Sequence, residues 1–266
     1  MNNLLLIDGH SILNRTFYGI PMLTNHEGIH TNAIYGFINI MLRAMEDEKS
    51  DHIAVAFDLK APTFRHKMYE MYKGTRKPMP AELHEQVPVI KEILASMNIP
   101  VITLEGYEAD DILGTVGKKA QSLGYNVVIL SGDRDLLQLA DEHIKIRLPK
   151  TIKGRTEIEN YYPEDVKEKY MATPSEFIDL KALMGDSSDN IPGVPGIGEK
   201  TAMSIISKYH SIENAYEHVE ELTPAKAKNS LRENYDLAKL SKVLATIETD
   251  APVEFNIEDS AIGNIF

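Results

Sequence analysis

The sequence predicts an α/β protein with a mostly parallel sheet and crossover helices, followed by a helical lobe. Apolar runs at residues 4–8, 52–58, 99–104 and 126–130 indicate buried strands. Helical patterns separate these runs, and such an alternation is typical of a parallel sheet that is covered on both faces.

Two of the separating segments carry an apolar stripe at helical spacing. The first stripe consists of Ile34, Phe37, Ile38, Met41, Leu42 and Met45. The second consists of Leu83, Val87, Ile90, Leu94 and Met97. We expect both stripes to pack against the sheet.

Strand signals fade beyond about residue 172, and the remaining sequence is predicted to be helical. Helical patterns occur at residues 175–184, 199–209 and 224–247. We therefore expect a core at residues 1–172 and a helical lobe at residues 173–266. No linker rich in proline, glycine or serine marks the boundary, so the two parts are expected to share an interface.

The composition restricts both the chemistry and the compartment. The chain of 266 residues has no cysteine, which excludes disulfides and leaves only oxygen or imidazole ligands for a metal. The N-terminus lacks the basic flank and the length of a signal peptide, and no apolar run approaches membrane-spanning length. We expect a cytoplasmic protein that does not enter a membrane.

Acidic residues follow each of the predicted strands. Because the carboxyl ends of parallel strands lie along one edge of a sheet, these side chains are expected to converge in one crevice. A further acidic pair begins the loop after the helical pattern at 175–184. The complete series is Asp8, Asp58, Glu108, Asp110, Asp111, Asp133, Asp135, Asp186 and Asp189.

A single acid of this kind usually caps a helix or lies in a solvated turn. Nine carboxylates in one crevice would repel one another, so they predict bound cations, and oxygen ligands favour Mg²⁺ or Mn²⁺. Removing these nine from the 40 acids leaves 31 against 28 bases, so the overall charge of −12 belongs largely to this series. Two such ions suit attack on a phosphodiester.

A basic segment between residues 60 and 77 has the composition of a nucleic-acid contact. Its cations are interleaved with Phe64, Tyr69 and Tyr72, whose rings could stack on unpaired bases. A solvated basic loop is the alternative. The cations are Lys60, Arg65, Lys67, Lys73, Arg76 and Lys77.

Three glycines, Gly193, Gly196 and Gly198, lie between the helical patterns at 175–184 and 199–209. Backbone amides at the start of the second helix would bind a phosphate. Most glycine-rich turns merely join two helices. The position of this turn directly after Asp186 and Asp189 favours the phosphate site.

The ordered motifs resemble those of the 5′ nuclease (flap endonuclease) family, which includes the N-terminal domain of bacterial DNA polymerase I. The resemblance runs from residue 4 to about residue 250. The motifs are Leu-Ile-Asp8-Gly, Ala-Phe-Asp58, Glu108-Ala-Asp110-Asp111, Ser-Gly-Asp133-Arg-Asp135 and Gly-Asp186-Ser-Ser-Asp189 followed by the glycine segment.

The resemblance implies a PIN-like nuclease core, a helical arch at about 60–85 and a helix-three-turn-helix at about 175–210. It implies a magnesium-dependent 5′-3′ exonuclease or 5′-flap endonuclease that acts on branched or 5′-ended DNA and on RNA primers during replication and repair. It also implies K⁺ at the helix-three-turn-helix and a monomer. The chain ends at Phe266, which matches a stand-alone member.

The resemblance also assigns roles to residues. Its first metal group comprises Asp8, Asp58, Glu108, Asp110, Asp111 and Asp133, and its second comprises Asp135, Asp186 and Asp189. The water-mediated ligands would include Asp8 and Glu108. The expected catalytic cations are Arg15, near the scissile phosphate, and Lys73 and Arg76, which match the basic residues of the arch through which a single strand passes. The expected DNA contacts are Tyr18, Lys67, Tyr72, Lys77, Gly193, Gly196, Gly198, Lys200 and Thr201.

Alternative roles remain open at several of these positions. Arg15 could form a surface salt bridge, and Tyr18 and Tyr72 could be ordinary packing residues. For the whole chain, the alternatives are a noncatalytic binder of branched DNA, an RNA-cutting PIN nuclease, or a phosphatase with Asp8 as nucleophile. The glycine segment argues against the last two, because neither needs a module that grips a duplex.

Overall fold

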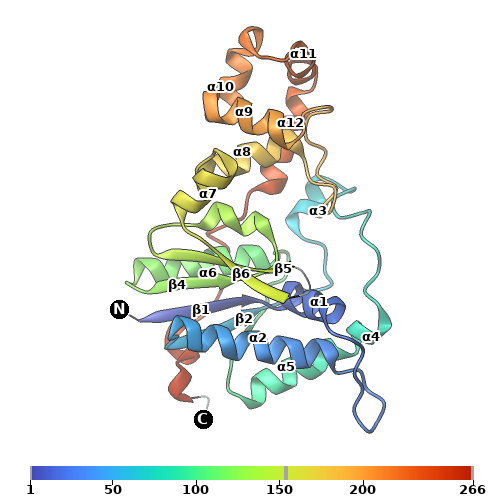
Figure 1. Cartoon of the computed structure of the whole chain (residues 1–266), viewed down its shortest axis with the longest axis vertical. Coiled ribbons are helices and arrows are strands. Elements are labelled where there is room, and N and C mark those ends of the chain that lie inside the picture. Colours follow the sequence, from blue (N-terminus) through green and yellow to red (C-terminus); the bar gives the residue numbers. More distant parts are fainter. Residues whose placement is uncertain (1, 153–154, 265–266) are drawn as a thin grey trace.

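A six-stranded sheet forms the centre of the computed structural model, which describes residues 2–152 and 155–264 (Figure 1). The strand order is β3-β2-β1-β4-β5-β6. Strands β1 to β5 are parallel, and β6 is antiparallel to β5. The strands are β1 (Asn3–Asp8), β2 (His52–Ala56), β3 (Val101–Ile102), β4 (Asn126–Leu130), β5 (Ile144–Ile152) and β6 (Arg155–Tyr161).

The four predicted strands are confirmed, and the mostly parallel sheet with them. The third is only two residues long, whereas six were expected. Strands β5 and β6 were missed. Strand β5 alternates Ile144, Ile146 and Leu148, which are buried, with Lys145 and Arg147, so it does not form a continuous apolar run.

Helices cover both faces of the sheet, because alternate side chains of the central strands point to opposite sides. Leu5 and Ile7 of β1 contact the layer of α1, α2 and α5, whereas Leu4 and Leu6 contact the layer of α6. The helices of the core are α1 (Gly9–Gly19), α2 (Asn32–Glu48), α3 (Phe64–Met68), α4 (Ala81–His84), α5 (Gln86–Ser96), α6 (Ala109–Ser122) and the 3₁₀ helix η1 (Arg134–Leu139).

The two predicted apolar stripes pack against the sheet with one exception. Phe37 and Met41 on α2, and Ile90 and Leu94 on α5, are fully buried. The expectation was wrong for Leu42, which is 42% exposed. It lies one position beyond Met41, and a step of one residue turns a side chain about 100° around the helix.

The second lobe is helical, as predicted. The expected helices at 175–184 and 199–209 are confirmed as α8 and α9, but the single helix expected at 224–247 is two, because Asn234 has a non-helical backbone. The elements of the lobe are α7 (Pro163–Tyr170), α8 (Pro174–Met184), α9 (Glu199–Tyr209), α10 (Ile212–Glu217), η2 (Val219–Glu221), α11 (Ala225–Glu233) and α12 (Tyr235–Ala245). The chain then returns to the sheet, where η3 (Ile257–Ser260) and η4 (Ile262–Asn264) lie beside the start of β2 (Figure 1).

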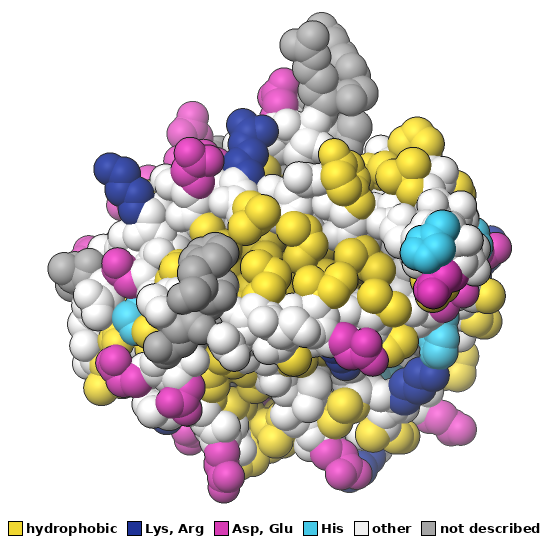
Figure 2. Space-filling view, turned by 90° about the horizontal axis from the view of Figure 1, so that it is seen from below, with side chains coloured by type: hydrophobic (Ala, Val, Ile, Leu, Met, Phe, Trp, Pro, Cys, Tyr) yellow, Lys and Arg dark blue, Asp and Glu magenta, His cyan; other side chains and the backbone are white. Residues whose placement is uncertain are grey.

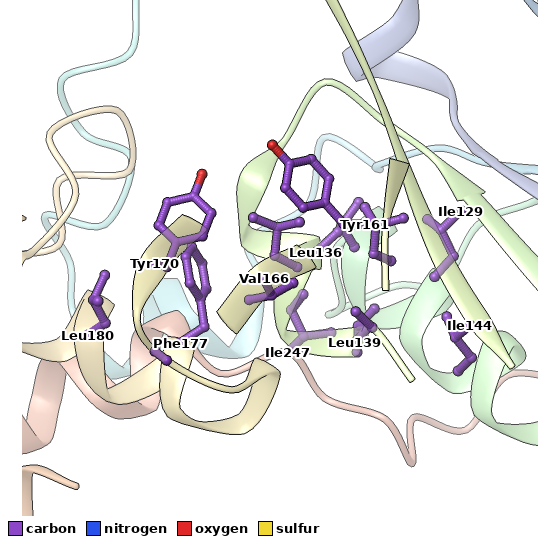
Figure 3. Packing of buried hydrophobic residues seen from close by; sticks show 14 of the residues in the cluster. Ile129, Leu136, Leu139, Ile144, Tyr161, Val166, Tyr170, Phe177, Leu180 and Ile247 are labelled. Atoms are coloured by element: carbon purple, nitrogen blue, oxygen red, sulfur yellow. The ribbon is translucent and has the colours of Figure 1, made fainter. Parts of the chain in front are cut away.

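The hydrophobic core runs without a break from the sheet into this lobe. Figure 3 shows Ile129 and Ile144 of the sheet, then Leu136, then Tyr170 and Phe177 of α7 and α8. The rings of Tyr170 and Phe177 meet edge to face, with their centroids 5.1 Å apart. Apolar packing of α7 and α8 against η1 and the sheet therefore holds the lobe on the core.

The expected arch at about 60–85 is helical only over α3 and α4. Between these short helices the chain forms turns and irregular backbone, and it descends along one side of the molecule (Figure 1). Pro78 and Pro80 explain the absence of helix, because proline lacks the amide hydrogen and restricts the preceding residue. Throughout the described part of the chain, no helix combines the length and apolarity needed to cross a bilayer.

Two glycines allow the loop between α8 and α9 to fold back on itself. Gly185 and Gly193 both have left-handed backbone angles, with φ of 69° and 62°. A Cβ atom on Gly185 would lie 2.6 Å from the carbonyl oxygen of Ile191. Only glycine fits this approach.

We expect Gly185→Ala to lower the free energy of unfolding by about 1–3 kcal/mol, because it adds a clash to an unfavourable φ. Gly19→Ala is the control, since a Cβ atom there meets nothing within 4 Å. Urea unfolding would measure both variants. Equal stability of the two variants would show that the close approach does not constrain this loop.

Candidate active site

Five carboxylates line one cleft at the carboxyl edge of the sheet. Asp8 ends β1, Asp58 follows β2 by two residues, and Asp133 follows β4 by three. Glu108 and Asp110 lie at the start of α6. The cleft has a volume of about 500 Å³, and residues from α1 and from the segment 73–77 complete its walls.

Several of these acids also cap helices. Asp8 accepts a hydrogen bond from the backbone N–H of Ser11 at 3.1 Å and another from Ser131 Oγ at 2.8 Å. Asp133 caps η1 by accepting from the N–H of Asp135 at 2.9 Å. Asp8 and Asp133 therefore cap helices and line the cleft at the same time, because the capping hydrogen bonds hold their side chains there.

Burial and mutual repulsion act on the carboxylates of this cleft. Burial raises the pKa of Asp8 to about 6, with the charge of Asp58 adding to the shift. Burial also raises the pKa of Asp110, and Asp133 and Asp8 reinforce it. At Asp58, burial is outweighed by hydrogen bonds from His10 and from the backbone of Ala109, so its pKa falls to about 2. The cleft favours a bound cation.

Basic side chains of the segment 72–76 supply positive charge to this cleft. Lys73 Nζ lies 2.6 Å from Glu108 Oε1 and 3.7 Å from Asp189 Oδ2. Tyr72 donates its hydroxyl to the same two carboxylates, and Arg76 pairs with Asp189. The basic segment therefore folds onto the acidic site and neutralises part of it.

A second cleft of about 520 Å³ adjoins the first. It contains Asp135 and Asp186, and it shares the wall formed by Asp133 with the first cleft. Burial raises the pKa of Asp135 to about 7, with Asp133 reinforcing the shift and Lys181 opposing it. Lys181 Nζ lies 2.7 Å from Asp135 Oδ1 and also contacts Asp186.

Asp111 does not face either cleft. It is fully buried, and its two oxygens accept four hydrogen bonds: two from Arg65, at 2.8 Å each, and one each from the backbone N–H groups of Glu108 and Glu248. Since every lone pair of this carboxylate is occupied, the geometry contradicts its expected role as a metal ligand. Asp111 instead anchors the first turn of α6 to α3.

Asp189 faces the basic segment, although the Ser188 hydroxyl links its carboxylate, at 3.4 Å, to that of Asp186, at 2.6 Å. It does not line the second cleft with Asp135 and Asp186, and its carboxylate faces Tyr72 and Arg76. The loop holds it there through the backbone, because Lys73 N donates to the carbonyl oxygen of Asp189 at 2.8 Å. The second group thus has two members in its cleft, and the third contacts the basic segment.

Among residues 2–152 and 155–264, no three carboxylate or imidazole groups are close enough to hold one ion directly. The donor set nevertheless fits Mg²⁺, which keeps several of its waters and is bound by few carboxylates. A hydrated ion spans the distance between side chains that do not share one coordination sphere. The ammonium groups of Lys73 and Lys181 lie beside Glu108 and Asp135, so each cleft binds a positive charge in this structure.

Residues on α1 extend the first cleft. Asn14 lines it, and Tyr18 follows one turn later on the same side of the helix. Arg15 is one position beyond Asn14 and does not line the cleft. Partial burial lowers the pKa of Arg15. Tyr18 is 72% exposed, so its ring is open to a ligand. Both remain candidates for contact with a substrate.

The proposed contacts of the basic segment divide into exposed and buried groups. Lys67 and Lys77 are exposed, and Lys77 lines the first cleft. Tyr72 is only 3% exposed and packs against Ile191 and Leu244. The geometry therefore contradicts stacking of Tyr72 on a base and supports its alternative role in packing.

The glycine loop also contains both buried and exposed residues. Gly193 is buried, and its N–H donates to Ser241 Oγ at 2.9 Å, so this amide is not offered to a phosphate. Gly196 and Gly198 are exposed at the start of α9, where Lys200 is exposed and Thr201 half-buried. The phosphate interpretation therefore fits the later part of the loop only.

Sequence reasoning missed the role of two buried cations. Arg65 was grouped with a basic loop, yet its side chain is 2% exposed and holds Asp111. Lys181 was not selected at all. The signal for Lys181 was its place between Leu180 and Ala182 on a helix, where a charge requires a nearby partner.

Two adjoining acidic clefts at the carboxyl edge of a parallel sheet, next to a helical lobe with a glycine loop, define the class of PIN-like nucleases. The chain belongs to the 5′-3′ exonuclease family. Residues 3–171 match the family's N-terminal resolvase-like domain, and residues 172–265 match its C-terminal SAM fold.

Relatives and solved structures agree with this assignment. DNA polymerase I of Bacillus subtilis (strain 168) is 50% identical over 96% of this chain, and that of Bacillus caldotenax is 48% identical over 97%. The chain covers 29% of each polymerase. T5 5′-exonuclease with bound zinc is 24% identical with a TM-score of 0.75, covering 93% of this chain and 90% of that one.

A more distant structure shares the fold. The catalytic core of Rad2 in complex with DNA substrate is 15% identical with a TM-score of 0.57, covering 97% of this chain and 84% of that one. The mostly parallel sheet with its helical lobe is thus a fold shared well beyond close relatives.

We expect Arg65→Ala to lower the free energy of unfolding by about 3–5 kcal/mol, because it leaves the buried charge of Asp111 without its partner. Lys67→Ala on the same short helix is the control, with a change within about 0.5 kcal/mol since Lys67 is exposed. Urea unfolding measures both. A small loss for Arg65→Ala would mean that solvent reaches Asp111.

We expect the stability of the metal-free protein to fall as the pH rises through about 6 and about 7, the pKa values of Asp8 and Asp135. These groups bind protons more tightly when folded than their usual value of 3.8 allows, so their contribution is full at low pH and is lost above those values.

The same deprotonation creates the ligands for a cation, so the rise in Tm on adding Mn²⁺ should increase over that pH range. Thermal unfolding with and without Mn²⁺ measures both effects. Equal stabilisation by Mn²⁺ at about pH 5 and about pH 8 would contradict the assignment of these carboxylates.

Proposed function

We propose that this chain is a structure-specific 5′-3′ exonuclease and 5′-flap endonuclease. It would hydrolyse phosphodiester bonds of DNA, and of RNA primers, during replication and repair. The observation that carries the proposal is the pair of acidic clefts that share Asp133 at the carboxyl edge of the sheet. Family membership supports the same conclusion.

The proposed cofactor is Mg²⁺ at two sites, with Mn²⁺ able to replace it. The first site would use Asp8, Asp58, Glu108, Asp110 and Asp133, and the second Asp135 and Asp186, with Asp189 joining after Arg76 leaves it. When bound, such a pair of ions activates a water and stabilises the leaving oxygen. Bound divalent ions in the T5 5′-exonuclease structure support a divalent cofactor.

The basic segment would act on the substrate by exchanging partners. Lys73 and Arg76 hold Glu108 and Asp189 in this structure. An entering phosphate offers the same cations a new anion, so both side chains can turn toward it over a short distance. Arg15 on α1 would contact the phosphate from the other side of the cleft. Positioned cations stabilise the charge of the transition state.

The proposed partner is DNA with a 5′ end or a branch. The exposed glycines and Lys200 at the start of α9 would hold the duplex backbone. Figure 2 shows the face opposite the lobe, where apolar side chains gather centrally and basic ones are few, so that face is poorly matched to phosphates. The Rad2 structure in complex with DNA substrate supports DNA as the partner.

Four further expectations remain proposals. We propose that the protein acts in the cytoplasm, that it is a monomer, and that the loop between α8 and α9 binds K⁺ through its carbonyl oxygens. We also propose a division into a core at 1–172 and a DNA-binding lobe at 173–266. The adjoining matches to the two family domains support this division.

The test is a cleavage-site map on a labelled 5′-flap oligonucleotide, with Mg²⁺ and then with Ca²⁺. We expect cutting near the junction with Mg²⁺ and binding without cutting with Ca²⁺. Asp110→Asn should slow cutting by at least about 100-fold, because it removes one charge from the cleft at nearly constant volume.

The matched control is Asp236→Asn, whose side chain is 95% exposed on α12 far from both clefts. It should cut at the wild-type rate. If the wild-type protein binds the flap in Mg²⁺ and leaves it intact, the chain is a noncatalytic binder of branched DNA.

A further inference from the structure

A lysine is built into the wall of the second cleft. The Lys181 side chain is 7% exposed, and α8 fixes its backbone between the core and α12. Its Nζ bridges Asp135 and Asp186, and the other carboxylates that line this cleft are Asp133 and Glu199. This contact joins η1 of the core to the loop that follows α8.

The two lysines beside the clefts differ in how firmly the chain holds them. Lys73 lies in the irregular segment between α3 and α4, outside any helix, and its side chain is 18% exposed. Lys181 lies in the last turns of α8, next to the buried Leu180 and Ala182. Its charge therefore remains within the cleft whatever else binds there.

Lys181 offsets part of the negative charge of the two carboxylates that it contacts. In the second cleft, Asp135 and Asp186 carry −2 and Lys181 returns +1, so this pair has a net charge of −1. In the first cleft, which holds five carboxylates, Glu108 contacts both Lys73, at 2.6 Å, and the buried Arg65, at 3.2 Å. An ion near Asp135 meets a fixed like charge at close range.

We propose that Lys181 is a built-in counter-cation of the second acidic group and that it lowers the affinity of that group for the second divalent ion. The proposal rests on the proposed two-metal function. Lys181 stabilises the metal-free cleft, and it delays the second ion until a phosphate adds negative charge. The second ion is then bound mainly together with the substrate.

The experiment measures Mn²⁺ binding to the full chain at a fixed pH near 8, by calorimetry and by the EPR signal of free Mn²⁺. Lys181→Met keeps the length of the side chain and removes the charge. Lys181→Arg keeps the charge. The matched control is Lys242→Met, because Lys242 also bridges two carboxylates, Asp179 at 2.7 Å and Glu213 at 2.8 Å, away from the clefts.

In Lys181→Met, we expect the weaker of two Mn²⁺ sites to tighten by at least about tenfold, because the like charge is gone. Lys181→Arg and Lys242→Met should bind as the wild type does. The metal-free Lys181→Met protein should also melt at a lower temperature and gain more from Mn²⁺ than the wild type gains. This gain distinguishes charge competition from general loss of structure.

Unchanged or weaker Mn²⁺ binding in a folded Lys181→Met protein would overturn the proposal, as would equal tightening in Lys242→Met. The wild-type protein separates this failure from failure of the proposed function. A wild-type chain that binds no Mn²⁺ and leaves the 5′ flap uncut would overturn the function itself, whereas a wild type that binds and cuts leaves Lys181 alone in question.

Discussion

Carboxylates at one edge of the sheet repel one another, and the arrangement of the cations, the basic segment and the lobe around them follows from this repulsion. A parallel sheet delivers the ends of β1, β2 and β4 to the same place, and each end carries an aspartate. Such a concentration of charge is tolerated only with cations beside it. Two of these cations, Lys73 and Lys181, belong to the chain itself. The negative charge that they leave unneutralised favours the binding of divalent ions.

Buried ion pairs determine how the surrounding parts are joined. Arg65 fixes α3 to Asp111 of α6 and also donates to carbonyl oxygens of Leu244 and Thr246 at the end of α12. Lys181 joins the lobe to η1. These contacts cross between segments that are distant in the chain. The core, the basic segment and the lobe therefore meet at the acidic edge of the sheet. A change of charge at this edge would alter the contacts of all three parts.

The family relatives extend far beyond the region that this chain matches, since the chain covers 29% of the polymerases from Bacillus. Within that region the acidic edge is self-contained: both clefts, the basic segment and the glycine loop come from one chain. The basic segment contacts the acids directly. Lys73 and Arg76, which we propose to bind a substrate phosphate, are thus already located at the acidic site.

The parallel sheet, the order of its acids and the helical lobe could be predicted from the sequence, because apolar runs that alternate with helical patterns are visible in short stretches of chain. It missed β5, because Lys145 and Arg147 interrupt its apolar residues although Arg147 is buried. It also could not separate Asp111 from Asp110, since adjacent aspartates look alike until helix α6 turns one inward and the other toward the cleft. Three features became clear from the packing of the folded chain: Asp189 faces the basic segment, the amide of Gly193 donates to Ser241, and Lys181 lies between two carboxylates. Each of these depends on contacts between segments far apart in the chain, and no local pattern records such contacts.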